Sequence, residues 1–114
     1  VEGKEKKRLA EMVGIGALKF NDLSQSRQKD ILFDWNRMLD FNGFSAPFLQ
    51  YSAVRCKSIL EKAGNKSEQS ESTIILKNKW EIKLAKKILG FSEAIKRSAE
   101  SYEPHHLAQY LFEL

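Results

Sequence analysis

The chain has 114 residues, of which 42% are hydrophobic, and a formal net charge of +4. This length suits one compact core, and the hydrophobic content excludes a wholly disordered tail. No apolar run approaches the roughly 20 residues that a membrane-spanning helix needs, and the charged residues 1–8 lack the pattern of a signal peptide. Cys56 is the single cysteine, so an internal disulfide is excluded, which is consistent with a protein of the reducing cytoplasm. We expect its thiol to be buried.

Helical spacing of apolar residues dominates the first half of the chain. Pro47 suits the first turn of the longest predicted helix, and Gly64 supplies its stop. Gly14 and Gly16 weaken the middle of the first predicted helix. The predicted elements of this half are a helix over 4–21, a short extended segment over 30–33, one or two helical turns over 35–40 and a helix over 47–63.

A polar loop over residues 65–71 separates this half from a second helical region. Caps and stops there predict helices from Ser72 or Thr73 to Leu89, from Ser92 to about Tyr102, and from Pro104 onward. Trp35 and Trp80 are expected in the core, although Trp80 lies among lysines and offers its ring to RNA in an alternative interpretation. The helix lengths predict an all-α fold, an antiparallel helix bundle.

One face of the helix over 47–63 carries a pattern suited to nucleic acid. Phe48, Tyr51 and Arg55 share this face at helical spacing. Aromatic rings stack on unpaired bases, and a guanidinium binds phosphate. The alternative is that both rings belong to the core and the guanidinium of Arg55 is simply exposed to solvent, and the spacing alone favours this alternative.

Basic residues are concentrated near the C-terminal end of the chain. Between Lys77 and Arg97 there are seven basic residues and two acidic ones. Such a surplus attracts a polyanion, and Lys79 and Lys83 are the candidate RNA contacts. A solvated helix face or an acidic partner protein would explain the same pattern.

His105 and His106 are adjacent, so they are expected to point to different sides of a helix. No cysteine or glutamate cluster completes a zinc ligand set beside them. The sequence therefore predicts no metal site.

Four segments, in the right order, resemble the arginyl-tRNA synthetases, which are class I aminoacyl-tRNA synthetases. In this family the segment at the entry to the anticodon-binding domain, which corresponds to the third segment here, has roughly the sequence Gly-Asn-Thr-Ala-Pro-Tyr-Leu-Gln-Tyr-Ala-x-x-Arg. The segments are 13–24 (VGIGALKFNDLS), 33–41 (FDWNRMLDF), 42–55 (NGFSAPFLQYSAVR) and 103–111 (EPHHLAQYL).

The resemblance implies a tRNA-binding role for the third segment. Positions matching Phe48, Tyr51 and Arg55 contact the anticodon arm in the family, and Gln50 lies beside them as a weaker candidate. Phe48 departs from the tyrosine that the family often has, so a ring is kept but a hydroxyl is lost. The resemblance also implies two regions: residues 1–45 as the end of the catalytic domain, and residues 46–114 as the first part of a helical anticodon-binding domain.

The resemblance further implies a longer parent enzyme that uses ATP, with magnesium, to attach arginine to its tRNA. The family's His-x-Gly-His and Lys-Met-Ser-Lys-Ser signatures do not occur in the sequence. We therefore expect a piece of a monomeric, cytoplasmic enzyme that has no catalytic residues of its own and is inactive alone. The alternatives are a class I synthetase for another amino acid and a basic helical interaction module without tRNA specificity.

Overall fold

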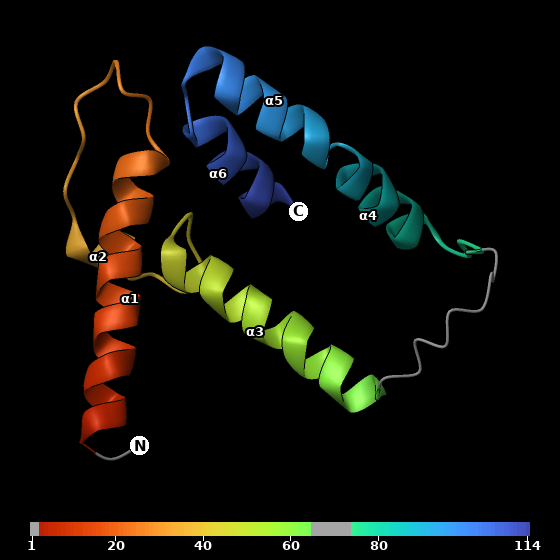
Figure 1. Cartoon of the computed structure of the whole chain (residues 1–114), viewed down its shortest axis with the longest axis horizontal. Helices are drawn as coiled ribbons and strands as arrows, with labels where there is room; N and C mark the ends of the chain where they lie inside the picture. The colour runs from red at the N-terminus through yellow and green to blue at the C-terminus, as the bar shows by residue number, and fades with distance from the viewer. Residues whose placement is uncertain (1–2, 65–73) are drawn as a thin grey trace.

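The computed structural model describes residues 3–64 and 74–114, and these residues form helices joined by turns and coil, with no β-strand among them (Figure 1). The all-α prediction is confirmed. Residues 30–33, where a short extended segment was expected, form no β-strand and are coil. The predicted loop over 65–71 and the caps Ser72 and Thr73 lie outside the described residues. The helices are α1 (Lys4–Leu23), α2 (Trp35–Met38), α3 (Ala46–Ala63), α4 (Lys79–Leu89), α5 (Phe91–Ser101) and α6 (His105–Glu113).

Small residues let α1 and α3 approach closely where they cross. Ala17 on α1 and Ala46 on α3 are buried there. A Cβ added at Gly16 would lie 2.6 Å from the Nε2 of Gln50, so glycine leaves the space that this amide occupies. Nε2 of Gln50 donates to the backbone carbonyl of Met12 at 3.3 Å, and this bond links α3 back to α1.

A chain of four phenylalanine rings joins three helices. Phe44 precedes α3 and contacts Phe20 of α1 and Phe112 of α6 edge-on, each with ring centroids 5.0 Å apart. Phe112 also contacts Phe48 of α3 at 5.1 Å. Edge-to-face packing suits the ring quadrupoles, so these contacts stabilise the junction beyond the area that they bury.

The first turn of α3 is held by Ser45, which is fully buried. Its hydroxyl accepts the backbone N–H of Phe48 at 3.3 Å and donates to the carbonyl of Asp40. Pro47 follows in the first turn as predicted, and Gly64 ends the helix with a φ of 70°. The sequence-based limits of this helix are therefore confirmed.

Replacing Ser45 by alanine is expected to lower the free energy of unfolding by about 1–2 kcal/mol, because the cap is lost and the partly buried bond to the carbonyl of Asp40 goes with it. Urea unfolding followed by circular dichroism measures this change. Ser58→Ala is the control, since Ser58 lies inside the same helix and helix propensity makes alanine neutral or slightly stabilising there. Equal losses in the two variants would contradict the capping role.

The starts of α4 and α5 differ from the sequence-based prediction, whereas α6 begins directly after Pro104 as expected. Asn78 caps α4, and with Glu81 it forms a reciprocal capping box, so the helix starts several residues after the predicted caps. Gly90 ends α4 as expected, but α5 begins directly at Phe91 without a side-chain cap from Ser92. Tyr102, in the left-handed region at φ 55°, turns the chain so that α6 runs back along α5 (Figure 1).

The helices form an open assembly in which only α5 and α6 make an antiparallel hairpin, and α3 and α4 lie apart (Figure 1). The radius of gyration is 17.3 Å, compared with about 13 Å for a compact domain of this length. Much of α3 and α4 therefore lacks packing partners among the described residues. None of the described helices combines the length and apolar character needed to cross a bilayer.

This openness explains three wrong predictions about the core. Cys56 is exposed on α3. Trp35 is 49% exposed, and its ring contacts Phe33 at 5.0 Å rather than a buried core. Trp80 is 65% exposed on α4. These three residues were assigned to the core because they are apolar or aromatic and lie in helical patterns, but no other described helix covers them.

The C-terminal ends of α4 and α6 are joined by two polar contacts. Nζ of Lys87 lies 2.5 Å from Oε2 of Glu113, and the hydroxyl of Tyr110 donates to the carbonyl of Lys87 at 2.6 Å. The hydrogen bond from Lys87, followed by one from Gln109 and by the positive charge of Lys87, lowers the pKa of Glu113 below its usual 4.5. This pair stabilises the folded chain while Glu113 is ionised.

Because the pKa of Glu113 is lower in the folded chain, its contribution to stability is present above pH 4.5 and is lost as the pH falls through the folded value. We expect Glu113→Gln to reduce the slope of unfolding free energy against pH between about pH 5 and pH 3. Glu100→Gln, which removes a carboxylate from an exposed pair with Lys96, is the control. A slope unaffected by Glu113→Gln would rule out this linkage.

Candidate nucleic-acid interface

The structure separates the six predicted RNA contacts into three groups, of which the first faces inward. Phe48 is half-buried and its ring contacts Phe112, while Gln50 is half-buried against α1. Both side chains are therefore engaged in holding α3 to its neighbours. The single aromatic face expected from the spacing is divided, because α6 covers only the first turn of α3.

Tyr51 and Arg55 form the second group, which we call the Tyr51–Arg55 pair, on the exposed part of α3. Tyr51 is 52% exposed, and Cζ of Arg55 lies 5.8 Å from its ring centroid. This distance is within the range of a cation–π contact, which orients the guanidinium beside the ring. An aromatic surface and a bidentate phosphate donor thus lie side by side and open to solvent.

Lys79 and Lys83 form the third group, on α4. Their ammonium groups lie 5.1 and 5.8 Å from the centroid of the Trp80 ring. This helix lies apart from α3, so the third group is a separate surface (Figure 1). Sequence analysis did not place Trp80 at the surface, although the lysines on both sides of it in the sequence were a signal for that alternative.

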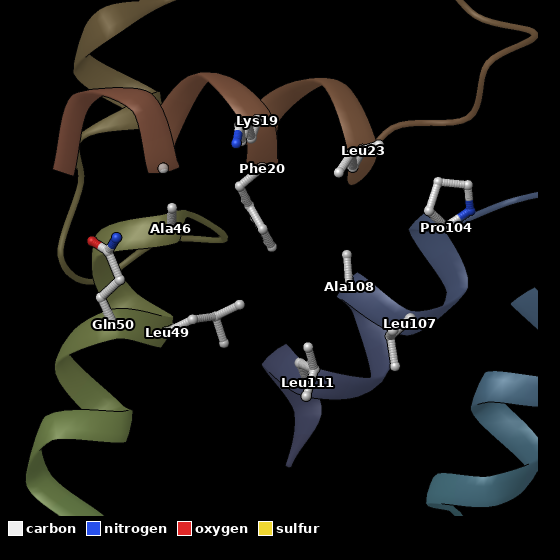
Figure 2. A pocket seen from close by; sticks show the side chains of 11 residues that line it. Lys19, Phe20, Leu23, Ala46, Leu49, Gln50, Pro104, Leu107, Ala108 and Leu111 are labelled. Carbon is white, nitrogen blue, oxygen red and sulfur yellow. The ribbon is translucent and has the colours of Figure 1, made fainter. Parts of the chain in front are cut away.

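An open apolar cavity of about 370 Å³ lies between α1, α3 and α6. Figure 2 shows Phe20 of α1 and Leu49 of α3 pointing toward this cavity, which is also lined by Leu23 of α1 and by Leu107 and Leu111 of α6. Lys19 is the only charged residue in its lining. A nucleotide site needs several converging polar groups, so this cavity is not part of the candidate RNA surface.

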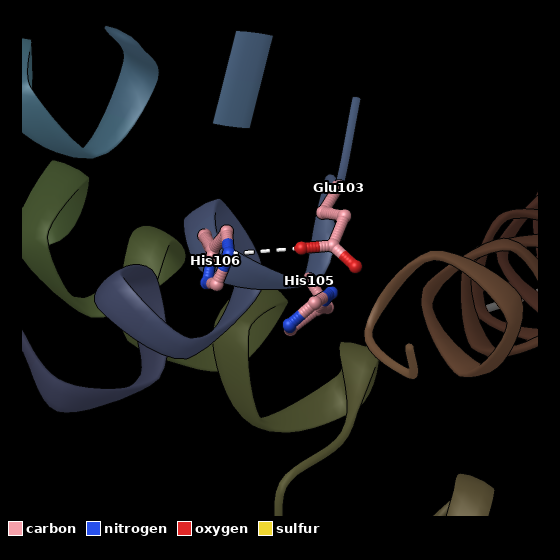
Figure 3. A group of neighbouring side chains, drawn as sticks. All are labelled: Glu103, His105 and His106. Carbon is pink, nitrogen blue, oxygen red and sulfur yellow. Dashed lines mark ion pairs between the residues drawn. The ribbon is translucent and has the colours of Figure 1, made fainter. Parts of the chain in front are cut away.

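Glu103, His105 and His106 form a cluster at the start of α6 (Figure 3). The two histidine rings lie 4.2 Å apart, so the expectation that they point to different sides is wrong. Nε2 of His106 lies 3.3 Å from a carboxylate oxygen of Glu103, which draws this ring toward the preceding turn. Nδ1 of His105 is buried and has no hydrogen-bond partner among the described residues.

This cluster is the group of described residues that comes nearest to a metal site. Its three donor atoms lie within 4.8 Å of one another. Tetrahedral zinc holds its nitrogen and oxygen donors at about 3.4 Å from one another and needs a fourth ligand. The contact between Glu103 and His106 is accounted for by the direct approach of the carboxylate to the ring nitrogen, and the absence of a metal site stays a prediction.

Comparison with known proteins identifies the class of this domain. Residues 49–114 match the family model of the DALR anticodon binding domain. The chain belongs to this family, and the match includes the Tyr51–Arg55 pair, α4, α5 and α6.

Over its whole length the chain is similar to arginine–tRNA ligases. It is 43% identical over 115 residues to that of Pasteurella multocida and 44% identical over 107 residues to that of Sodalis glossinidius, and the matches include 100% and 94% of this chain. The solved arginyl-tRNA synthetase of Thermus thermophilus matches 99% of the chain with 36% identity and a TM-score of 0.83. The chain spans about a fifth of the length of these relatives (20%, 19% and 19%). The family resemblance drawn from the four sequence segments is confirmed.

Proposed function

We propose that this chain is the part of an arginine–tRNA ligase that binds the anticodon arm of tRNA. The observation that carries the proposal is the similarity of the whole chain to arginine–tRNA ligases. The exposed Tyr51–Arg55 pair, which lies within the matched anticodon-binding domain, supports it.

The Tyr51–Arg55 pair supplies the two interactions that an RNA loop requires. The ring of Tyr51 stacks on an unpaired base, and Arg55 binds the neighbouring phosphate. Lys79 and Lys83 add positive charge on α4, which raises the association rate and makes binding depend on salt. Phe48 and Gln50 act indirectly: they hold the first turns of α3 against α6 and α1 and so position the Tyr51–Arg55 pair.

Residues 1–45 serve as the junction with the catalytic domain, and residues 46–114 form the first part of the anticodon-binding domain. The close crossing of α1 and α3, with Gln50 bonded to Met12, connects the two regions directly. Binding at α3 therefore fixes the orientation of the tRNA relative to α1. That orientation holds the acceptor end in register at a distant catalytic site.

The parent enzyme forms arginyl-adenylate from arginine and ATP, with magnesium, and transfers arginine to its tRNA. The residues of this chain do not fit an ATP site, since neither signature segment nor a glycine-rich phosphate loop occurs in the sequence. We place the parent in the cytoplasm as a monomer, as its resemblance implies, and we expect no arginyl-tRNA formation by this chain alone.

The test is a titration of the chain with two RNA stem-loops, one carrying the anticodon arm of an arginine tRNA and one with the same stem and a scrambled loop. We expect tighter binding to the cognate loop at both low and high salt. Equal affinity for both loops that falls steeply with salt would show that the chain binds RNA only through non-specific electrostatic attraction, and it would overturn the proposal. Charging assays on the parent enzyme with each amino acid separate arginine from the other class I specificities.

A further inference from the structure

The exposed ring of Trp80 is a feature that the proposed function does not use. Trp80 is 65% exposed, and tryptophan offers the largest stacking surface of any side chain. It lies in the first turn of α4, where the capping box formed by Asn78 and Glu81 fixes the backbone. The ring is therefore presented from a rigid position rather than from a flexible loop.

Helical geometry places Trp80 at a boundary between two kinds of surface. At about 100° per residue, Leu84 lies about 40° to one side of Trp80 around the helix and Lys83 about 60° to the other. Leu84 begins an apolar stripe that continues to Ile88, whereas Lys79 and Lys83 lie on the basic side. Trp80 differs from the residues of the apolar stripe, because two cations lie against its ring.

The two lysines are available to a polyanion. Neither Lys79 nor Lys83 forms an ion pair with a carboxylate in the part of the chain that the structure describes. By contrast, Lys87 is paired with Glu113, and Glu81 is engaged in the cap. Asn78 and Glu81 occupy the N–H groups at the start of α4, so the positive charge that a polyanion meets here is that of the two ammonium groups.

We propose that Trp80, Lys79 and Lys83 form a second RNA site, in which Trp80 stacks on an unpaired nucleotide and the lysines bind its flanking phosphates. This inference rests on the proposed function, which supplies RNA as the partner. The two ammonium groups lie over the ring, at 5.1 and 5.8 Å from its centroid, and the side chain is still 65% exposed. A base can therefore stack on the ring once these two exposed lysine side chains turn toward its phosphates. The site is separate from the Tyr51–Arg55 pair, because α4 and α3 lie apart (Figure 1).

Tryptophan fluorescence reports on this site directly. In a Trp35→Phe background the chain has one tryptophan, and stacking of a base on it quenches its emission. We expect quenching that saturates as the cognate stem-loop binds, and we expect Trp80→Ala to weaken binding by about 5- to 150-fold, the equivalent of one stacked base. Trp80→Phe should keep most of the affinity, and Leu89→Ala, an exposed apolar residue of the same helix, should change nothing.

The outcomes separate this inference from the proposed function. Unchanged tryptophan emission at saturation, or full RNA affinity in Trp80→Ala, would overturn the second site. The proposed function would still stand if Tyr51→Ala weakened binding of the cognate stem-loop. Quenching with equal affinity for cognate and scrambled loops supports the site and overturns loop recognition. Quenching of the same size by polyglutamate would show that the surface takes an acidic protein, and it would overturn the RNA site.

Discussion

Replacing Tyr51 by alanine is expected to weaken binding of the cognate stem-loop by about 5- to 150-fold, because one base–aromatic stack contributes about 1–3 kcal/mol. The ring is exposed and its one described cation contact is with Arg55, so its loss removes a binding surface and leaves the packing of α3 unchanged. Fluorescence anisotropy of a labelled stem-loop measures the change. The helical circular dichroism of the variant should equal that of the unaltered chain.

Two variants sharpen this prediction. Tyr51→Phe keeps the stacking surface and should retain most of the affinity, whereas Leu60→Ala removes an exposed apolar side chain from the same helix and should have no effect. Arg55→Gln should weaken binding to both cognate and scrambled loops and reduce the salt dependence by about one ion. If Tyr51→Ala bound as tightly as Leu60→Ala, the Tyr51–Arg55 pair would not be the anticodon-arm site.

Replacing Phe112 by alanine is expected to cause the largest loss of stability, about 2–4 kcal/mol. Its ring contacts both Phe44 and Phe48, so its removal breaks the link between α6 and the start of α3. The midpoint of urea unfolding, followed by circular dichroism, measures the loss.

The control for Phe112 is Phe33→Ala. Phe33 is exposed and its aromatic contact among the described residues is with Trp35, so its loss should be less than about 1 kcal/mol. Similar losses in the two variants would show that the chain of four rings does not hold the helices together.

Local chemistry made part of the fold predictable. Pro47 and Gly64 define α3 through backbone restraints that act within a few residues, and the structure keeps both limits. The start of α4 was missed although Asn78 and Glu81 have the spacing of a capping box, because several other residues upstream were equally good caps. Local signals indicate that a helix exists more reliably than they decide between competing caps.

Contacts between distant residues could not be predicted. The spacing of Phe48 and Tyr51 is the same whether a ring is buried or free, and only the position of Phe112, more than sixty residues later, decides that Phe48 packs inward. The place of Gln50 depends in the same way on the missing side chain of Gly16. Trp80 and Cys56 were assigned to a core because apolar spacing does not reveal whether another element covers the stripe.

The central claim is that this chain contacts the anticodon arm of tRNA. Hydroxyl-radical footprinting of a complete arginine tRNA, with and without the chain, tests the claim most directly. We predict protection centred on the anticodon loop, reduced in the Tyr51→Ala variant at equal protein concentration. Protection confined to the acceptor stem, or spread evenly along the backbone, would contradict the claim.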